Sequence, residues 1–165
     1  MSTSELILYE EEFQKIKSII AKLKADANAK LVFVVDRNGQ QIAQVGDITD
    51  IDTTSLASLT AGNVAATDGL ARLMGQEEFN ILFHEGRHDN VHISIVGRRV
   101  ILVVIFDERS SLGLVRLRVK RSTVELEQVF DTIMQKVEQE RTTLTQAESP
   151  FAEITDDDID SLFGD

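Results

Sequence analysis

The pattern of hydrophobic and polar positions along the chain predicts three helices and five strands. In three segments the hydrophobic residues recur every three or four positions, as they do on one face of an α-helix: residues 10–26, 53–74 and 112–140. Five shorter hydrophobic or alternating runs are typical of strands: residues 31–35, 41–45, 79–83, 91–95 and 100–106.

The beginning of the last helical segment also fits a strand. Val115, Leu117 and Val119 alternate with charged residues, which is the pattern of a half-buried strand. However, a spacing of three and four residues runs from Leu112 to Ile133. One long helix accounts for more of these positions than a strand followed by a helix, so we interpret residues 112–140 as a helix.

Two of the strands, residues 31–35 and 100–106, are hydrophobic on both sides and must be covered on both faces. They therefore belong in the centre of a sheet that has helices on each face. Short turns at Asn38-Gly39 and at residues 97–99 favour antiparallel neighbours. Together these features predict an α/β (α+β) sandwich built on an antiparallel sheet.

The composition excludes several classes of protein. With 165 residues, 42% of them hydrophobic, the chain is long enough for one globular domain with a tail, and it contains no cysteine. Disulfides and cysteine zinc sites are therefore excluded, as in many cytosolic proteins. We expect neither a signal peptide nor a membrane span, since the longest apolar run is seven residues. The net charge of −11 disfavours binding to nucleic acid.

The negative charge gathers at the end of the chain. Residues 142–165 contain seven acids and no base, whereas residues 1–141 carry 21 acids and 17 bases. We therefore expect a domain at 1–141 and an acidic flexible tail at 142–165. Thr155 and Asp158 resemble a capping box, which predicts a short partner-binding helix at about residues 155–163. The alternative is a tail that packs on its own domain. The hydrophobic residues expected to anchor the tail are Phe151, Ile154, Ile159, Leu162 and Phe163.

No sequence motif points to catalysis, and no cofactor is expected. The chain has no glycine-rich phosphate loop, and no serine, histidine and carboxylate are arranged as a triad. His84, His88 and His92 have the spacing of metal ligands on a helix, but Gly86 and the Asp89-Asn90 pair break any helix there. We interpret them as surface or edge histidines, not as a metal site. A binding or regulatory module is favoured over an enzyme.

Thr53 or Thr54 is expected to cap the second helix, residues 53–74. This helix carries two apolar stripes. Leu56, Leu59, Asn63, Leu70 and Leu73 are expected to face the core. Small residues form the other stripe: Ala57, Ala61, Ala65 and Gly69. A stripe without long side chains permits close approach, either within the chain or by a protein partner, and both interpretations remain open.

Several segments resemble the Roadblock family: residues 51–66, 83–86, 104–107 and 111–118. Residues 149–154 and 157–163 resemble the tail of its bacterial members that regulate gliding motility and cell polarity. The resemblance implies a five-stranded antiparallel sheet in the order 2-1-5-4-3, with the second helix on one face and two helices on the other. It also implies a homodimer in which third strands and second helices meet. Phe79, Ile81 and Phe83 would then lie at the dimer interface.

The resemblance further implies that one homodimer binds one bacterial Ras-like small GTPase of the MglA type and stimulates its GTP hydrolysis. Such a regulator is cytoplasmic, with enrichment at a cell pole, and has no active site of its own. The alternatives are a non-catalytic scaffold and a stimulator of nucleotide exchange. Residues implied to bind the GTPase are Ala61, Ala65 and Gly69 on the second helix and Phe151, Ile154, Ile159, Leu162 and Phe163 in the tail.

Overall fold

A computed structural model describes residues 3–47 and 49–147. Residues 1–130 form one compact unit, and the second unit begins at residue 131. The helices are α1 (Thr3–Ala27), α2 (Thr53–Leu73) and α3 (Leu112–Ala147). The strands are β1 (Leu31–Asp36), β2 (Gln41–Gly46), β3 (Ile81–Glu85), β4 (Asn90–Val96) and β5 (Val100–Phe106).

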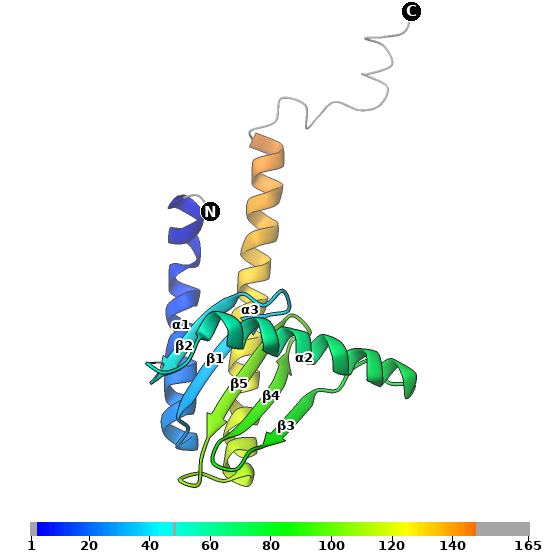
Figure 1. Cartoon of the computed structure of the whole chain (residues 1–165). Coiled ribbons are helices and arrows are strands. Elements are labelled where there is room, and N and C mark those ends of the chain that lie inside the picture. The colour runs from blue at the N-terminus through cyan, green and yellow to red at the C-terminus, as the bar shows by residue number, and fades with distance from the viewer. Residues whose placement is uncertain (1–2, 48, 148–165) are drawn as a thin grey trace, which may run out of the picture. The chain divides into compact units, whose positions relative to one another are not determined.

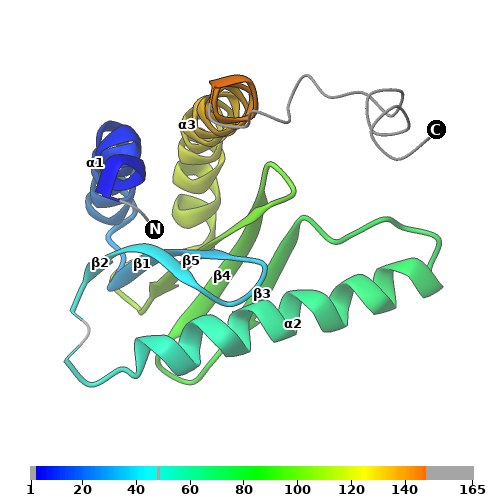
Figure 2. The ribbon, with the colours of Figure 1, turned by 90° about the horizontal axis from the view of Figure 1, so that it is seen from above.

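The five strands form one antiparallel sheet in the order β2-β1-β5-β4-β3. Helix α2 covers one face, while α1 and the part of α3 that belongs to the first unit lie on the other (Figures 1 and 2). This arrangement confirms the fold class predicted from the sequence pattern and the strand order that the family resemblance implies.

The centre of the sheet is the most buried part of the molecule. All seven residues of β5 are buried, as are the first five of β1. Since side chains alternate along a strand, each central strand contributes to two hydrophobic layers. Phe33, Ile101 and Val103 belong to the layer beneath α2, and the alternate positions face α1 and α3. The prediction that these two strands lie centrally is therefore confirmed.

The turn between β1 and β2 is a hairpin, as the Asn-Gly pair predicts, but only Gly39 adopts a positive φ, of 90°. The Asp36 carboxylate accepts hydrogen bonds from the backbone N–H groups of Asn38 and Gln40 at 2.9 Å, and this holds the turn in place of a second left-handed residue. A Cβ at Gly39 would lie 3.2 Å from the Cα of Ser58. Glycine thus allows the turn to approach α2.

Asp52 caps the N-terminus of α2. Its carboxylate accepts hydrogen bonds from the backbone N–H of Ser55 at 3.1 Å and from the Ser55 hydroxyl at 2.6 Å. These hydrogen bonds lower the pKa of the Asp52 carboxyl below its ordinary value. The expectation that Thr53 or Thr54 would cap this helix is therefore wrong.

Loss of this cap is expected to destabilise the fold. Asp52→Ala leaves the first-turn N–H groups without an acceptor, so the midpoint of thermal unfolding should fall by a few degrees. Asp52→Ser keeps a side-chain acceptor and should unfold close to the original chain. Equal midpoints for the alanine and serine variants would show that the cap is not a stabilising contact.

Residues 112–120 are helical, as interpreted from the sequence, although Leu117 is 63% exposed. The buried positions of α3 keep the helical spacing: Val115, Val119, Ser122, Leu126 and Val129. The helix continues without interruption through residue 142, so the boundary between domain and tail stays a prediction. The expected helix at 155–163 and the five hydrophobic residues expected to anchor the tail lie outside the described part of the chain.

No helix in the described part of the chain has the length and hydrophobicity needed to span a lipid bilayer.

Candidate functional site

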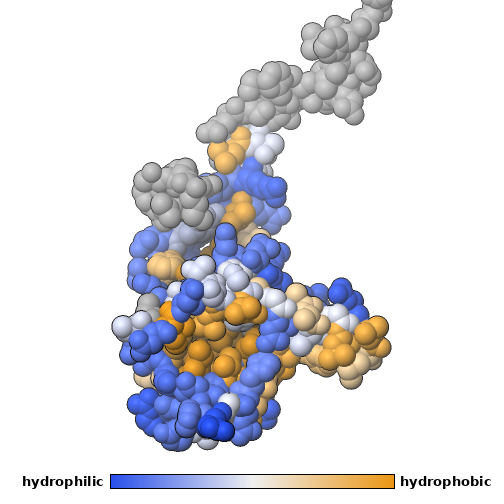
Figure 3. Space-filling model, in the orientation of Figure 1, coloured by the Kyte–Doolittle hydropathy of each residue, from blue (hydrophilic) through white to orange (hydrophobic). Residues whose placement is uncertain are grey.

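The outward side of α2 carries several exposed hydrophobic side chains. Leu59, Leu70 and Leu73 are 73%, 51% and 87% exposed, and Met74 at the end of the helix is also exposed. These leucines were expected in the core, and that expectation is wrong. Figure 3 shows hydrophobic residues gathered over the C-terminal end of this helix.

The small side chains of α2 pack inward instead. Ala57 and Ala61 are 1% and 8% exposed, and with Val64 they join the hydrophobic layer of β1 and β5. A helix can lie close to a sheet only where its side chains are short, because a larger residue would push the two elements apart. Ala57 and Ala61 therefore serve close packing within the chain, which was one of the two interpretations of the stripe.

The other half of the predicted stripe remains accessible. Ala65 is exposed, Gly69 is partly exposed, and a Cβ at Gly69 or at Gly62 would meet no atom within 4 Å. We name the surface formed by the exposed apolar and small residues of α2 the α2 outer face. It comprises Leu59, Gly62, Ala65, Ala66, Gly69, Leu70 and Leu73.

The predicted GTPase-binding residues of α2 thus divide into one buried and two accessible positions. Ala61 offers little surface to a partner, whereas Ala65 and Gly69 lie on the α2 outer face. Contact of any of them with a GTPase stays a prediction. Leu59, Leu70 and Leu73, which sequence reasoning did not assign to a binding surface, lie beside them. These three leucines share one side of the helix, opposite the small residues Ala57 and Ala61. This spacing is the sequence signal that could have identified them as part of an exposed surface.

Strand β3 forms an edge of the sheet, and it begins two residues later than expected. Ile81 is 51% exposed, and the ring of Phe83 stacks on Phe106 with centroids 6.2 Å apart. Phe79 is half-buried and precedes the strand. An exposed hydrophobic edge strand is a pairing surface for another chain. The role of Phe79, Ile81 and Phe83 in a dimer interface stays a prediction.

Arg37 fixes the C-terminal half of α2 against the rest of the fold. Its guanidinium donates to Asp68 of α2 at 3.1 Å and to Glu78 before β3 at 2.7 Å. Its Nε also donates to the carbonyl oxygen of Arg98 in the β4–β5 turn at 2.5 Å. Charge-assisted contacts of this kind are stronger than neutral hydrogen bonds. They hold the C-terminal half of α2 against the β1–β2 turn, which contains Arg37.

The three histidines do not converge, and their interpretation as surface or edge residues is wrong for His92, which is buried in the inner strand β4. His84 is paired with Val91, and His92 with Phe83, so the two histidines point to opposite faces of the sheet. His84 lies 2.8 Å from the side-chain amide of Asn63, while His88 lies in the β3–β4 turn. Among the residues that the structure describes, no group of three side chains could hold a metal ion.

His92 makes the stability depend on pH. Burial lowers the pKa of its imidazole below the ordinary value, and the Arg116 guanidinium lowers it further. Below about pH 6.5 the unfolded chain therefore binds more protons than the folded chain. We expect the free energy of unfolding to decrease as the pH falls from about 6.5 toward the lower pKa of the folded state. Urea unfolding of His92→Leu should show a smaller decrease across that range, and an equal decrease would contradict the assignment.

The chain belongs to the Roadblock/LC7 family, whose domain model matches residues 15–106. Within that family its fold is similar to solved structures of MglB. MglB of Myxococcus xanthus is 60% identical, with a TM-score of 0.73, and the match covers 75% of this chain and 93% of that chain.

Two further MglB structures are similar at lower identity. The gliding protein MglB of Thermus thermophilus is 28% identical with a TM-score of 0.68, and the match covers 72% of this chain and 90% of that chain. An MglB with a tetrameric arrangement is 27% identical with a TM-score of 0.69, and the match covers 72% of this chain and 89% of that chain. Comparison with curated protein sequences gives no match.

Proposed function

We propose that this protein is a GTPase-activating protein for a bacterial Ras-like small GTPase of the MglA type, and that it regulates gliding motility and cell polarity. The α2 outer face carries the proposal. It is mainly apolar, with the exposed Arg72 beside its C-terminal end, and Arg37 holds it on the side of the sheet that α1 and α3 leave open. The 60% identity to an MglB and the description of a second relative as a gliding protein support it.

The active form in this proposal is a homodimer that binds one GTPase. The exposed edge of β3 would pair with the same strand of a second copy, which brings two α2 helices side by side. One GTPase then lies across both α2 outer faces. Assembly between copies has a parallel in the relative described with a tetrameric arrangement. In the cell, the dimer would act in the cytoplasm with enrichment at a pole.

The proposed stimulation uses no catalytic group of this chain. None of the residues that make up the α2 outer face is an acid, a base or an arginine, although the exposed Arg72 lies beside it. Arg109 is held by Asp107 at 3.0 Å. Many activating proteins insert an arginine that stabilises charge in the transition state. Here the apolar contact would instead hold loops of the GTPase in the arrangement that is competent for hydrolysis.

The dependence of binding affinity on the nucleotide held by the GTPase separates an activating protein from a non-catalytic scaffold and from a stimulator of nucleotide exchange. A protein can shift a partner's conformation only by binding one state more tightly than the other. An activator should bind the GTPase loaded with a non-hydrolysable GTP analogue at least about tenfold more tightly than the GDP form. Equal affinities would favour a scaffold, and tightest binding to the nucleotide-free GTPase would favour an exchange stimulator.

Removal of residues 149–165 is expected to weaken GTPase binding without changing the fold. This truncation deletes Phe151, Ile154, Ile159, Leu162 and Phe163 but no residue of the described helices and strands. Each anchor is worth about 1.5–3 kcal/mol if fully enclosed by a partner, less the free energy of ordering the segment. Titration calorimetry should give at least about tenfold weaker binding.

Two controls accompany the truncation. The melting temperature should remain that of the full chain, and hydrolysis at saturating protein should be unchanged, because the tail supplies no reacting group. Unchanged affinity would contradict a tail that docks on the GTPase, and lost turnover at saturation would place the tail in the catalytic step.

A further inference from the structure

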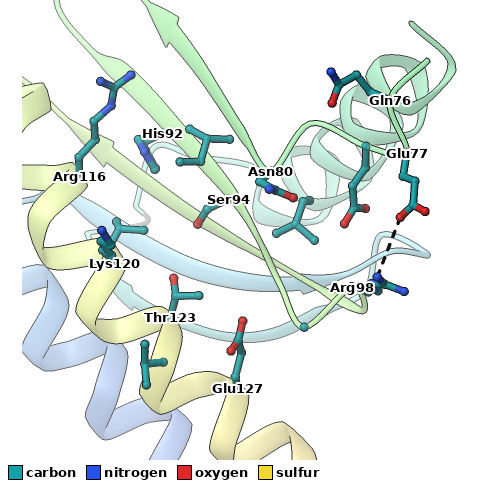
Figure 4. A pocket seen from close by; sticks show the side chains of 16 residues that line it. Gln76, Glu77, Asn80, His92, Ser94, Arg98, Arg116, Lys120, Thr123 and Glu127 are labelled. Atoms are coloured by element: carbon teal, nitrogen blue, oxygen red, sulfur yellow. Dashed lines mark ion pairs between the residues drawn. The ribbon is translucent and has the colours of Figure 1, made fainter. Parts of the chain in front are cut away.

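A cavity of about 1080 Å³ opens between α3 and the strands β3 and β4 (Figure 4). It lies on the face of the sheet opposite α2, so it is separate from the proposed GTPase-binding surface. His92 and Ser94 of β4 line its floor, and Arg116, Lys120 and Thr123 of α3 line one wall.

Two buried polar side chains on the floor have no partner. His92 is completely buried and neither ring nitrogen forms a hydrogen bond; Ser94 is 5% exposed and its hydroxyl is also unpaired. A buried polar group without a partner is costly, and native proteins rarely leave one so. His92 and Ser94 are two residues apart on β4, so both side chains face the cavity. Together they indicate a ligand that completes their hydrogen bonding.

The charge in the cavity is divided between its two ends. Arg116 and Lys120, one helical turn apart, lie near His92 at one end (Figure 4). Neither forms a salt bridge with any residue that the structure describes. At the other end Glu78 is held by Arg37 at 2.7 Å, and Glu127 lies three helical turns from Arg116, about 16 Å along the axis. The end near His92 is therefore basic.

We propose that this cavity binds an acidic peptide segment of a partner protein. One carboxylate of the peptide lies between Arg116 and Lys120, where it accepts hydrogen bonds from the buried imidazole and hydroxyl. The open length of the cavity, about three turns of α3, suits a peptide. Val124 is 55% exposed along it and would contact an apolar neighbour of that carboxylate. The sites on the two faces of the sheet can be occupied at once.

The test is a binding titration with the full chain and a fluorescent synthetic peptide of alternating leucine and aspartate residues. Arg116→Glu and Lys120→Glu change exposed residues, so the fold should persist. We expect each to weaken binding at least about tenfold. Arg121→Glu makes the same charge change on the same helix outside the cavity and should alter affinity less than about twofold. A peptide with asparagine in place of aspartate should bind at least about tenfold more weakly.

Nuclear magnetic resonance of the His92 ring nitrogens gives a readout that does not depend on net charge. Their signals should shift on addition of the aspartate peptide and stay unchanged with the asparagine peptide. Absence of binding, equal weakening by Arg121→Glu, or unshifted ring signals would overturn the proposal. Acetate or inorganic phosphate that binds as tightly as the peptide would make the cavity a small-anion site and would overturn it too. Since Arg116→Glu should leave GTPase affinity unchanged, the proposal can fail while the proposed function stands.

Discussion

Gly69→Arg is expected to abolish GTPase binding while the fold remains intact. A Cβ at Gly69 meets no atom within 4 Å, and an arginine removes the unfavourable helix propensity of glycine. The domain should therefore unfold at the same or a higher temperature. The long cation projects from the α2 outer face, where close approach is needed, and affinity should fall at least about 30-fold, or about 2 kcal/mol.

The matched control for this variant is Gly113→Arg. Gly113 is also a helical glycine with open space around it, but it lies at the start of α3. The control should bind the GTPase as the original chain does. Ala61→Arg should behave differently from both, because it places a long side chain in the layer beneath α2 and destabilises the domain. Undiminished binding by Gly69→Arg would exclude the α2 outer face as the contact.

Ile81→Lys is expected to convert the proposed homodimer to a monomer. Two copies that pair through β3 would cover the exposed Ile81 side chain, and a lysine there would place a charge in an apolar contact. Light scattering at micromolar concentration should give twice 18.4 kDa for the original chain and 18.4 kDa for the variant.

Leu117→Lys provides the control, since Leu117 is an exposed hydrophobic residue on α3, away from the sheet edge. It should remain a dimer. A mass of 18.4 kDa for the original chain across this range would contradict the homodimer itself.

The sequence predicted the sheet more successfully than the placement of α2. Strands β1 and β5 are hydrophobic on both sides, so both of their faces must be covered. Both strands lie in the centre of the sheet, as predicted. Helix α2 has two apolar faces, and periodicity alone does not say which faces inward. Leu59, Leu70 and Leu73 were assigned to the core and are exposed, whereas Leu56, Ala57 and Ala61 pack toward the sheet.

The cap at Asp52 was missed in favour of the adjacent threonines, a shift of one residue that local patterns do not resolve. Other features depended on contacts between distant segments. The burial of His92 follows from the position of α3 over β4, which are separate elements of the chain with β5 between them. The cavity around it therefore had no signature in the sequence.

Single-turnover GTP hydrolysis by the cognate GTPase, with and without saturating protein, tests the central claim most directly. Tryptophan is absent from this chain, so an intrinsic tryptophan signal from the GTPase would report on the partner alone. The proposed function predicts an acceleration of at least about tenfold that Gly69→Arg abolishes and Gly113→Arg retains. The same rate constant in the presence and absence of the protein, with binding demonstrated, would contradict the claim and leave a scaffold.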